Sequence, residues 1–206
     1  MRLYLTSSFK DTVNVFKNFE KPEVGKKVTF IPTASIVEEV NFYVAMGKEA
    51  LENCGLIVEE LEISTATKEE IATKLEANDY IYISGGNIFF LLQELKKKEA
   101  HKMIIEQVGN GKVYIGESAG SIIVTKNVEY SKAMDNPSKA PELSNYDALN
   151  LVDFYIVPHY GCMPFEAEAQ AIVDEYSEKL ELITIANEDV VIIENSEIKV
   201  VTSDDK

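Results

Sequence analysis

Short apolar runs alternate with longer amphipathic stretches along almost the whole chain. The runs are rich in β-branched and aromatic residues, which predicts strands at 3–6, 28–31, 56–63, 80–84, 113–115 and 154–157. The stretches between them predict helices, among them 12–19, 88–95 and 164–180. In these strands apolar residues follow one another without alternating with polar ones. The pattern therefore favours an α/β fold with a mainly parallel sheet and helices on both faces.

Two capping-box patterns mark further helix starts. Ser35 and Glu38 have the spacing at which a hydroxyl and a carboxylate cap the same first turn, and Thr67 and Glu70 repeat it. We therefore expect a helix after each pair, the second ending near residue 77. Segments 182–186, 190–194 and 198–202 close the chain as β structure, and the last two form a hairpin near the C-terminus.

Composition and charge narrow the class of protein. The 206 residues are 46% hydrophobic, enough for one full core, and we expect a single domain over 1–206 with one long irregular segment at 127–150. The net charge of −15 argues against nucleic acid or an anionic membrane as a partner. Two unpatterned cysteines, Cys54 and Cys162, suit a reducing cytoplasm and indicate neither a metal nor a cofactor. We expect a cytoplasmic monomer or homodimer.

The segment 112–126, KVYIGESAGSIIVTK, carries the clearest chemical signal. A strand passes through Gly116-Glu117-Ser118-Ala119-Gly120 into an apolar, helix-compatible stretch. A serine at the apex of such a strand–turn–helix is typical of a nucleophile, and the glycines leave room for the cramped turn. The turn lifts the Ser118 hydroxyl clear of the sheet. It also places the Ala119 N–H at a helix N-terminus, where it can meet an oxyanion.

A serine nucleophile needs a general base, and the chain offers only two histidines. His101 lies in the charged stretch KKKEAHK, which is typical of a solvated helix surface. His159 follows the predicted strand at 154–157, so it comes to the same sheet edge as Ser118. We expect His159 to be the base, with its pKa moved upward from ~6.5 by a neighbouring carboxylate.

Two further roles have several candidates in the sequence: the acid that orients the base, and the second donor of the oxyanion hole. Two candidate acids, Glu188 and Asp189, lie in a turn late in the chain. The others lie between the serine and the histidine: Asp135, Asp147 and Asp153. Gly85-Gly86, after the strand at 80–84, can supply an oxyanion amide because a residue without Cβ lets a carbonyl approach closely. Asn87 follows these glycines, and it can take part in the same site or cap the helix that begins there.

Four segments together resemble the peptidase E and cyanophycinase family of serine peptidases. They are FIPTAS at 30–35, ISGGNIF at 83–89, YIGESAGS at 114–121 and Pro158-His159, in the family's order. The resemblance implies the flavodoxin-like fold of class I glutamine amidotransferases and hydrolysis of small peptides. It also implies a triad of Ser118, His159 and Glu188, with Asp189 as the alternative acid.

The same resemblance implies the other site residues. The oxyanion amides are those of Gly86 and Ala119, and Gly85 and Asn87 take part in substrate binding. Asp135 follows the elbow at a spacing like that of a functionally important aspartate in peptidase E.

One feature of the family is missing from this chain. Aspartate-specific dipeptidases of the family hold the substrate carboxylate with an arginine after the catalytic histidine, but here that stretch reads PFEAEAQAIVDEY. With Glu166 and Glu168 lining the site in place of a bidentate cation, we expect a peptidase that is not strictly specific for aspartate.

Two other functions fit the serine motif. An α/β-hydrolase-type esterase also has G-x-S-x-G, but its acid precedes the histidine, so Asp135, Asp147 or Asp153 would take the place of Glu188. A non-catalytic ligand-binding or regulatory member of the amidotransferase-like fold is the third hypothesis, since fold alone does not fix function.

Overall fold

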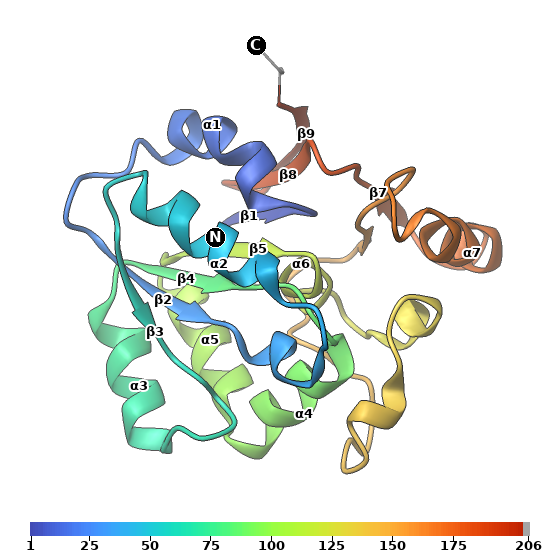
Figure 1. Ribbon diagram of the computed structural model, residues 1–206, viewed down its shortest axis with the longest axis horizontal. Helices are drawn as coiled ribbons and strands as arrows, with labels where there is room; N and C mark the ends of the chain where they lie inside the picture. The colour runs from blue at the N-terminus through green and yellow to red at the C-terminus, as the bar shows by residue number, and fades with distance from the viewer. Residues whose placement is uncertain (204–206) are drawn as a thin grey trace.

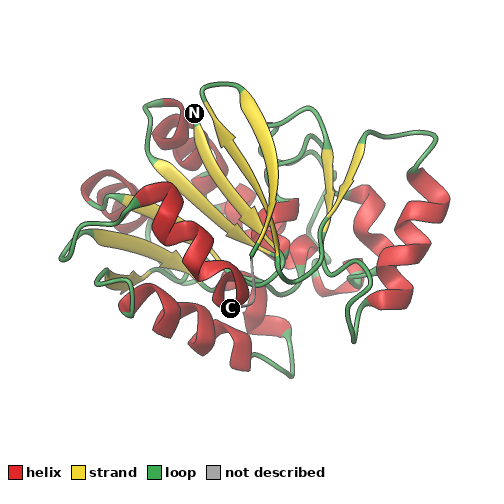
Figure 2. Ribbon diagram, turned by 90° about the horizontal axis from the view of Figure 1, so that it is seen from above, coloured by secondary structure: helices red, strands yellow, loops and turns green. Residues whose placement is uncertain are grey.

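A seven-stranded sheet runs through the centre of the computed structural model, which describes residues 1–203 (Figures 1 and 2). Its order is β3-β2-β4-β5-β1-β8-β9. The first five strands in that order are parallel: β3 (Ile57–Glu60), β2 (Lys27–Ile31), β4 (Tyr80–Ile83), β5 (Val113–Glu117) and β1 (Arg2–Thr6). β8 (Asp189–Glu194) and β9 (Glu197–Thr202) are antiparallel. The predicted parallel sheet and C-terminal hairpin are therefore confirmed.

Helices cover both faces of this sheet, because its strands carry apolar side chains on both sides. On one face lie α1 (Phe9–Glu20) and α2 (Phe42–Glu52), and on the other α3 (Lys68–Ala77), α4 (Ile88–Lys97) and α5 (Ala100–Gly109) (Figure 1). Successive side chains of a strand enter the two cores alternately. In β4, Tyr82 packs under α1 and α2, whereas Ile83 joins the core under α3 to α5.

A separate pair of short parallel strands stands beside the main sheet (Figure 2). These are β6 (Tyr155–Val157) and β7 (Leu182–Thr184), and between them in sequence comes α7 (Glu166–Tyr176). The irregular segment at 127–150 packs nearby and includes two 3₁₀ turns, η2 (Glu129–Ala133) and η3 (Pro137–Lys139). The strand predicted at 154–157 is present, but it pairs outside the main sheet.

The two capping-box predictions had different outcomes. Thr67 caps α3 as expected, with its hydroxyl accepting the Glu70 N–H at 3.2 Å and the Glu70 carboxylate accepting the Thr67 N–H at 2.8 Å. The prediction at Ser35 is wrong, because its hydroxyl donates back to the Pro32 carbonyl inside the 3₁₀ helix η1 (Thr33–Val37). The next α-helix, α2, begins only at Phe42.

None of the helices within residues 1–203 is both long enough and apolar enough to cross a membrane.

Candidate active site

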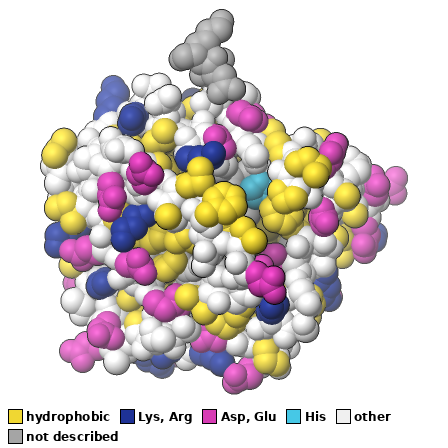
Figure 3. Space-filling view, in the orientation of Figure 1, with side chains coloured by type: hydrophobic (Ala, Val, Ile, Leu, Met, Phe, Trp, Pro, Cys, Tyr) yellow, Lys and Arg dark blue, Asp and Glu magenta, His cyan; other side chains and the backbone are white. Residues whose placement is uncertain are grey.

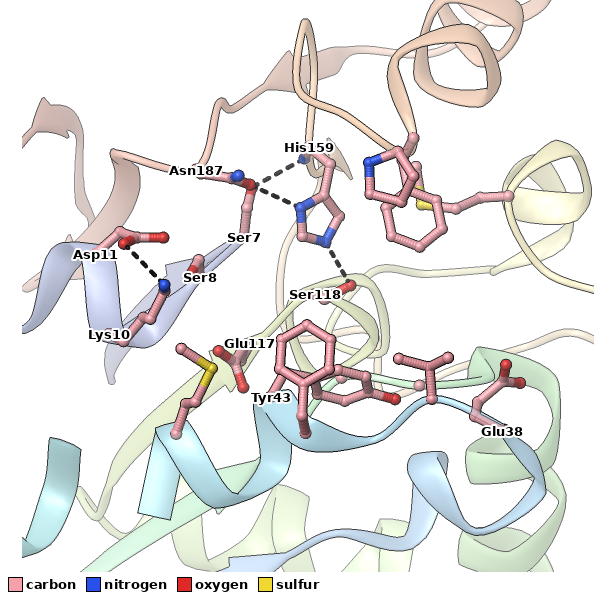
Figure 4. Close-up of a pocket in the computed structure, with 18 of the residues that line it drawn as sticks. Ser7, Ser8, Lys10, Asp11, Glu38, Tyr43, Glu117, Ser118, His159 and Asn187 are labelled. Atoms are coloured by element: carbon pink, nitrogen blue, oxygen red, sulfur yellow. Dashed lines mark hydrogen bonds and ion pairs between the residues drawn. The ribbon is translucent and has the colours of Figure 1, made fainter. Parts of the chain in front are cut away.

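The carboxyl ends of β1, β4 and β5 open into a cavity of about 490 Å³. The residues that follow these strands line it: Ser7 and Ser8 after β1, Gly85 and Gly86 after β4, and Ser118 after β5. His159 and Asn187 enter from the loops that follow β6 and β7 (Figure 4). Figure 3 shows hydrophobic side chains gathered around a histidine on this face. The structure thus brings the predicted nucleophile and base into one hollow.

Ser118 occupies the sharp turn between β5 and the short helix α6 (Ala119–Ile122), with φ 51° and ψ −108°. Its N–H donates to the Thr6 carbonyl at 2.9 Å, which ties the turn to the neighbouring strand. A Cβ on Gly116 would overlap the Gly120 carbonyl, and one on Gly120 would overlap the Ile83 carbonyl. The flanking glycines are therefore needed for the reason expected from the motif.

His159 completes a hydrogen-bonded chain that starts at this serine. Its Nε2 lies 3.0 Å from the Ser118 Oγ, and its Nδ1 lies 2.8 Å from the Asn187 Oδ1 (Figure 4). Because an amide oxygen can only accept, Nδ1 carries the proton and Nε2 is free to accept the Ser118 O–H. The Phe165 ring packs against the imidazole, with 5.0 Å between centroids. This is the arrangement that general-base activation of a serine requires.

The orienting partner of His159 is therefore an amide, and the expectation of a Glu188 carboxylate there is corrected. Asp189, the alternative, is occupied by its own turn: its carboxylate accepts the Ala186 N–H at 2.9 Å and the Thr202 hydroxyl at 2.7 Å. The position preceding Glu188 is the one that faces the imidazole. The acids of the esterase hypothesis do not fill the role either, since Nδ1 is already paired with Asn187.

Burial lowers the pKa of the His159 imidazole below its usual value, because desolvation disfavours the charged ring. The hydrogen bond to Asn187 opposes this effect in part. The expected upward shift of the pKa by a carboxylate neighbour is therefore wrong in direction. Burial thus favours the neutral ring, which is the state that can accept a proton from the serine.

Gly86 and Ala119, the two predicted oxyanion donors, belong to the loop after β4 and to the start of the helix after Ser118. Gly86 has φ 128°, and a Cβ at this position would overlap the backbone of Ala34. Ala119 begins α6, directly after Ser118. Within residues 1–203 neither amide N–H donates to another protein group, and Gly86 lines the cavity.

A buried carboxyl group, that of Glu117, directly precedes the predicted nucleophile in the chain. Glu117 accepts the Phe9 N–H at 2.9 Å and the Tyr82 hydroxyl at 2.7 Å. Burial raises the pKa of Glu117 to about 7, and the bonds from Phe9 and Tyr82 oppose that shift. This residue anchors the start of α1 to the end of β5, just below Ser118.

Two residues assigned to substrate binding differ in where they lie. Asp135 lines the cavity, accepts the Ile88 N–H at 3.0 Å, and has its pKa raised by burial to about 7. The Asn87 side chain is buried and instead accepts the Phe90 N–H at 3.1 Å and donates to the Asn136 carbonyl at 3.2 Å. Asn87 is thus a helix cap, while Gly85 lies against the Ser118 side chain.

The cavity is lined by carboxyl groups, although not by the two predicted from sequence. Glu166 and Glu168 lie on α7 and do not line it, so that expectation is corrected. The carboxyl groups belong to Asp11, Glu38, Glu117 and Asp135. Among the described residues of the cavity wall, Lys10 alone carries a positive charge, and its Nζ lies 3.8 Å from Asp11.

An elbow serine with a histidine within hydrogen-bond distance, beside a substrate-sized cavity, is the arrangement that a serine-type hydrolase requires, and the family comparison identifies a peptidase. The model of Peptidase family S51 matches residues 3–201, and the chain belongs to this family. The chain is 55% identical over 196 residues to the uncharacterized peptidase Lmo0363 of Listeria monocytogenes, covering 95% of this chain and 96% of that one.

Two further comparisons connect the chain to peptidase E. Peptidase E of Shewanella denitrificans is 34% identical over 136 residues, which cover 66% of this chain and 54% of that protein. A crystal structure assigned to peptidase E, from Listeria monocytogenes EGD-e, superposes with a TM-score of 0.94 at 53% identity and covers 98% of both chains. The fold class and the enzyme class expected from the sequence are thereby confirmed.

Asn187 is the main site residue that the sequence argument did not single out. It stands in the same strand-end turn as the two acids that were considered. The available signal was its position after the run at 182–186, at the sheet edge that carries Ser118 and His159. Because only acidic side chains were expected to orient the base, Asn187 was not considered for this role.

Proposed function

We propose that this protein hydrolyses short peptides by acyl transfer through Ser118, with His159 as general base and Asn187 as its orienting partner. The observation that carries the proposal is the 3.0 Å contact between the Ser118 Oγ and the His159 Nε2, made inside a cavity open to substrate. This proposal replaces the Glu188 of the expected triad by Asn187.

The reaction proceeds in two halves. His159 takes the Ser118 proton at Nε2 while Oγ bonds to the peptide carbonyl carbon, and the carbonyl oxygen becomes an oxyanion. The N–H groups of Gly86 and Ala119 stabilise that oxyanion. His159 then returns its proton to the leaving amine as the C–N bond breaks. Water, deprotonated by the same imidazole, releases the acyl group and restores the serine.

Asn187 fixes the imidazole without adding charge. Its amide oxygen keeps the proton on Nδ1 and so maintains the tautomer that catalysis needs. A neutral partner stabilises the imidazolium less than a carboxylate does, and burial disfavours it further. The site therefore works with a weaker base that stays deprotonated to lower pH.

The cavity supports short peptides without a strict preference for aspartate. Its volume suits a ligand of small-molecule size. Among the described residues of its wall, Asp11 and Glu38 face a single lysine, Lys10. Glu117 and Asp135, whose pKa values are raised to about 7, add partial negative charge near neutral pH. This wall opposes an acidic side chain and favours a basic one. The rest of the wall favours large apolar groups and includes Val40, Phe42, Met46, Met134, Met163 and Phe165.

A panel of dipeptides and short peptides tests this function. The first residue is varied among lysine, leucine, phenylalanine and aspartate, and kcat/KM is measured with the Ser118→Ala variant as the blank. We expect the aspartyl peptides to be cleaved at least about tenfold less efficiently than the best basic or apolar ones. A preference for aspartate contradicts the specificity, and cleavage that survives in Ser118→Ala contradicts the mechanism.

The two cysteines support an intracellular, reducing location for this activity. Cys54 is buried and Cys162 half-buried, and both are free thiols. Disulfides are rare and free thiols common in the cytoplasm.

A further inference from the structure

The contact between nucleophile and base spans two different sheets. Ser118 follows β5 of the seven-stranded sheet, whereas His159 follows β6 and Asn187 follows β7. Within residues 1–203, β6 and β7 pair only with each other. The distance between the Ser118 Oγ and the His159 Nε2 therefore depends on how the small sheet is fixed to the large one.

Ser7 connects the two sheets at the site itself. It directly follows β1, the strand that lies between β5 and β8, and it is only 2% exposed. Its hydroxyl accepts the His159 N–H at 3.0 Å (Figure 4). The same hydroxyl donates to the Ile185 carbonyl at 3.1 Å. One side chain of the large sheet thus binds the chain after β6 and the chain after β7.

The backbone of His159 needs such a partner. Its φ is 59°, in the left-handed region that non-glycine residues adopt only when their surroundings impose it. The neighbouring Tyr160 N–H donates to the Ile185 carbonyl at 3.0 Å, which is the same oxygen that accepts from Ser7. These bonds hold the loop in a conformation in which the imidazole reaches Ser118.

We infer that Ser7 is a positioning residue of the peptidase: its hydroxyl holds the His159 backbone so that Nε2 meets the Ser118 Oγ. This inference rests on the proposed function. Ser7 makes its two hydrogen bonds to the backbone of other residues, and it acts on the reaction only through His159.

The first test compares Ser7→Ala with Ser131→Ala. Ser131 is a matched control because it is also buried and its hydroxyl donates to a backbone carbonyl, that of Val128 at 2.7 Å, but it does not line the cavity. In Ser7→Ala we expect kcat to fall about tenfold or more, with KM within about twofold of wild type. Ser131→Ala is expected to keep the wild-type kcat.

The second readout is the state of the imidazole, which a merely structural role would not change. The chain has only two histidines, so a His101→Gln background leaves His159 as the one imidazole signal in an NMR titration. Loosening His159 in Ser7→Ala admits water and reduces the desolvation that lowers its pKa. We expect the titration of the free enzyme and the acid limb of kcat/KM to move together to higher pH.

A near-isosteric variant covers the case in which Ser7→Ala does not fold. Ser7→Cys keeps the volume and a weak acceptor, so we expect a folded protein with kcat between those of wild type and Ser7→Ala. If Ser7→Ala or Ser7→Cys retains the wild-type kcat and the wild-type His159 titration, the inference is overturned. It is also overturned if Ser131→Ala loses as much kcat as Ser7→Ala.

These outcomes are separable from failure of the proposed function itself. If Ser118→Ala keeps the activity of wild type, the function is wrong whatever Ser7 does. If Ser118→Ala is inactive and the Ser7 variants behave as wild type, the peptidase mechanism stands and the positioning role falls.

Discussion

The Asn187 Oδ1 accepts the His159 Nδ1–H at 2.8 Å, so the proposed base is oriented by a neutral amide. The amide and the imidazole come from the ends of the two paired strands β7 and β6, which fixes their relative position. The hydrogen bond between His159 and Asn187 fixes the orientation and the tautomer of the imidazole. It supplies no negative charge to stabilise an imidazolium. The electrostatics of the site therefore differ from those of a serine site with a carboxylate in this place.

Asn187→Asp changes this charge while keeping the size of the side chain. A carboxylate beside Nδ1 favours the protonated imidazole, so the pKa of His159 rises. Because the reaction needs neutral His159, the acid limb of kcat/KM moves to higher pH, by about one unit. Glu188→Gln is the control and leaves the profile of kcat/KM against pH unchanged. An acid limb that moves in Glu188→Gln and not in Asn187→Asp would return the orienting role to Glu188.

The wild-type pH profile follows from the same burial. Activity is lost as pH falls through the pKa of His159, and desolvation places this pKa below the usual 6.5. The half-maximal kcat/KM on the acid side should therefore fall below pH 6.5. It is measured with a neutral peptide substrate, whose own groups do not titrate in that range. A midpoint clearly above 6.5 contradicts a desolvated histidine with a neutral partner.

Glu117 makes the stability of the fold depend on pH. Its pKa is raised from 4.5 to about 7, so the folded protein holds a proton that the unfolded chain has lost between these values. This contribution to the free energy of unfolding is fully present below pH 4.5 and is lost as pH rises through about 7.

The Glu117→Gln variant isolates that contribution. Glutamine cannot titrate, so the fall in the free energy of unfolding across this pH window should be smaller than in wild type. The variant also disturbs the bonds to Phe9 and Tyr82, and we expect about 1–3 kcal/mol of lost stability at the acid end. Urea unfolding at several pH values measures both effects. Identical pH slopes for the two proteins would show that Glu117 does not carry a proton in the fold.

Gly86→Ala tests the oxyanion loop. A Cβ there overlaps the Ala34 backbone, so the loop must move and its N–H is displaced from the oxyanion. Loss of one such donor lowers kcat by about 10²- to 10³-fold. Gly109→Ala is the control, because a Cβ at Gly109 meets nothing within 4 Å. Circular dichroism checks the fold of each variant, and a folded Gly86→Ala enzyme with wild-type kcat would remove Gly86 from the mechanism.

How far the sequence predicts this molecule depends on whether the relevant interactions are local. The Ser118 elbow could be predicted because its glycines and its strand–turn–helix order lie within a few residues of each other. The Thr67 capping box is local in the same way, whereas the Ser35 pattern failed because Pro32 and its neighbours close a 3₁₀ turn first.

The remaining features of the site depend on pairing between distant segments. β6 and β7 pair with each other because 155–157 and 182–184 meet in space, which no local pattern indicates. That pairing decides which residue of the turn after β7 faces His159. Asp189 is drawn into bonds with Ala186 and Thr202, and Asn187 is left facing the imidazole.

Labelling with a fluorophosphonate probe tests the central claim most directly, because it needs no knowledge of the substrate. An activated Ser118 attacks the phosphorus, and intact-mass analysis should show one adduct on the wild-type chain, mapped to Ser118 by peptide analysis. Ser118→Ala should gain no adduct, and His159→Ala should label far more slowly. A wild-type protein that stays unlabelled, or a Ser118→Ala variant that labels as well as wild type, would contradict the account.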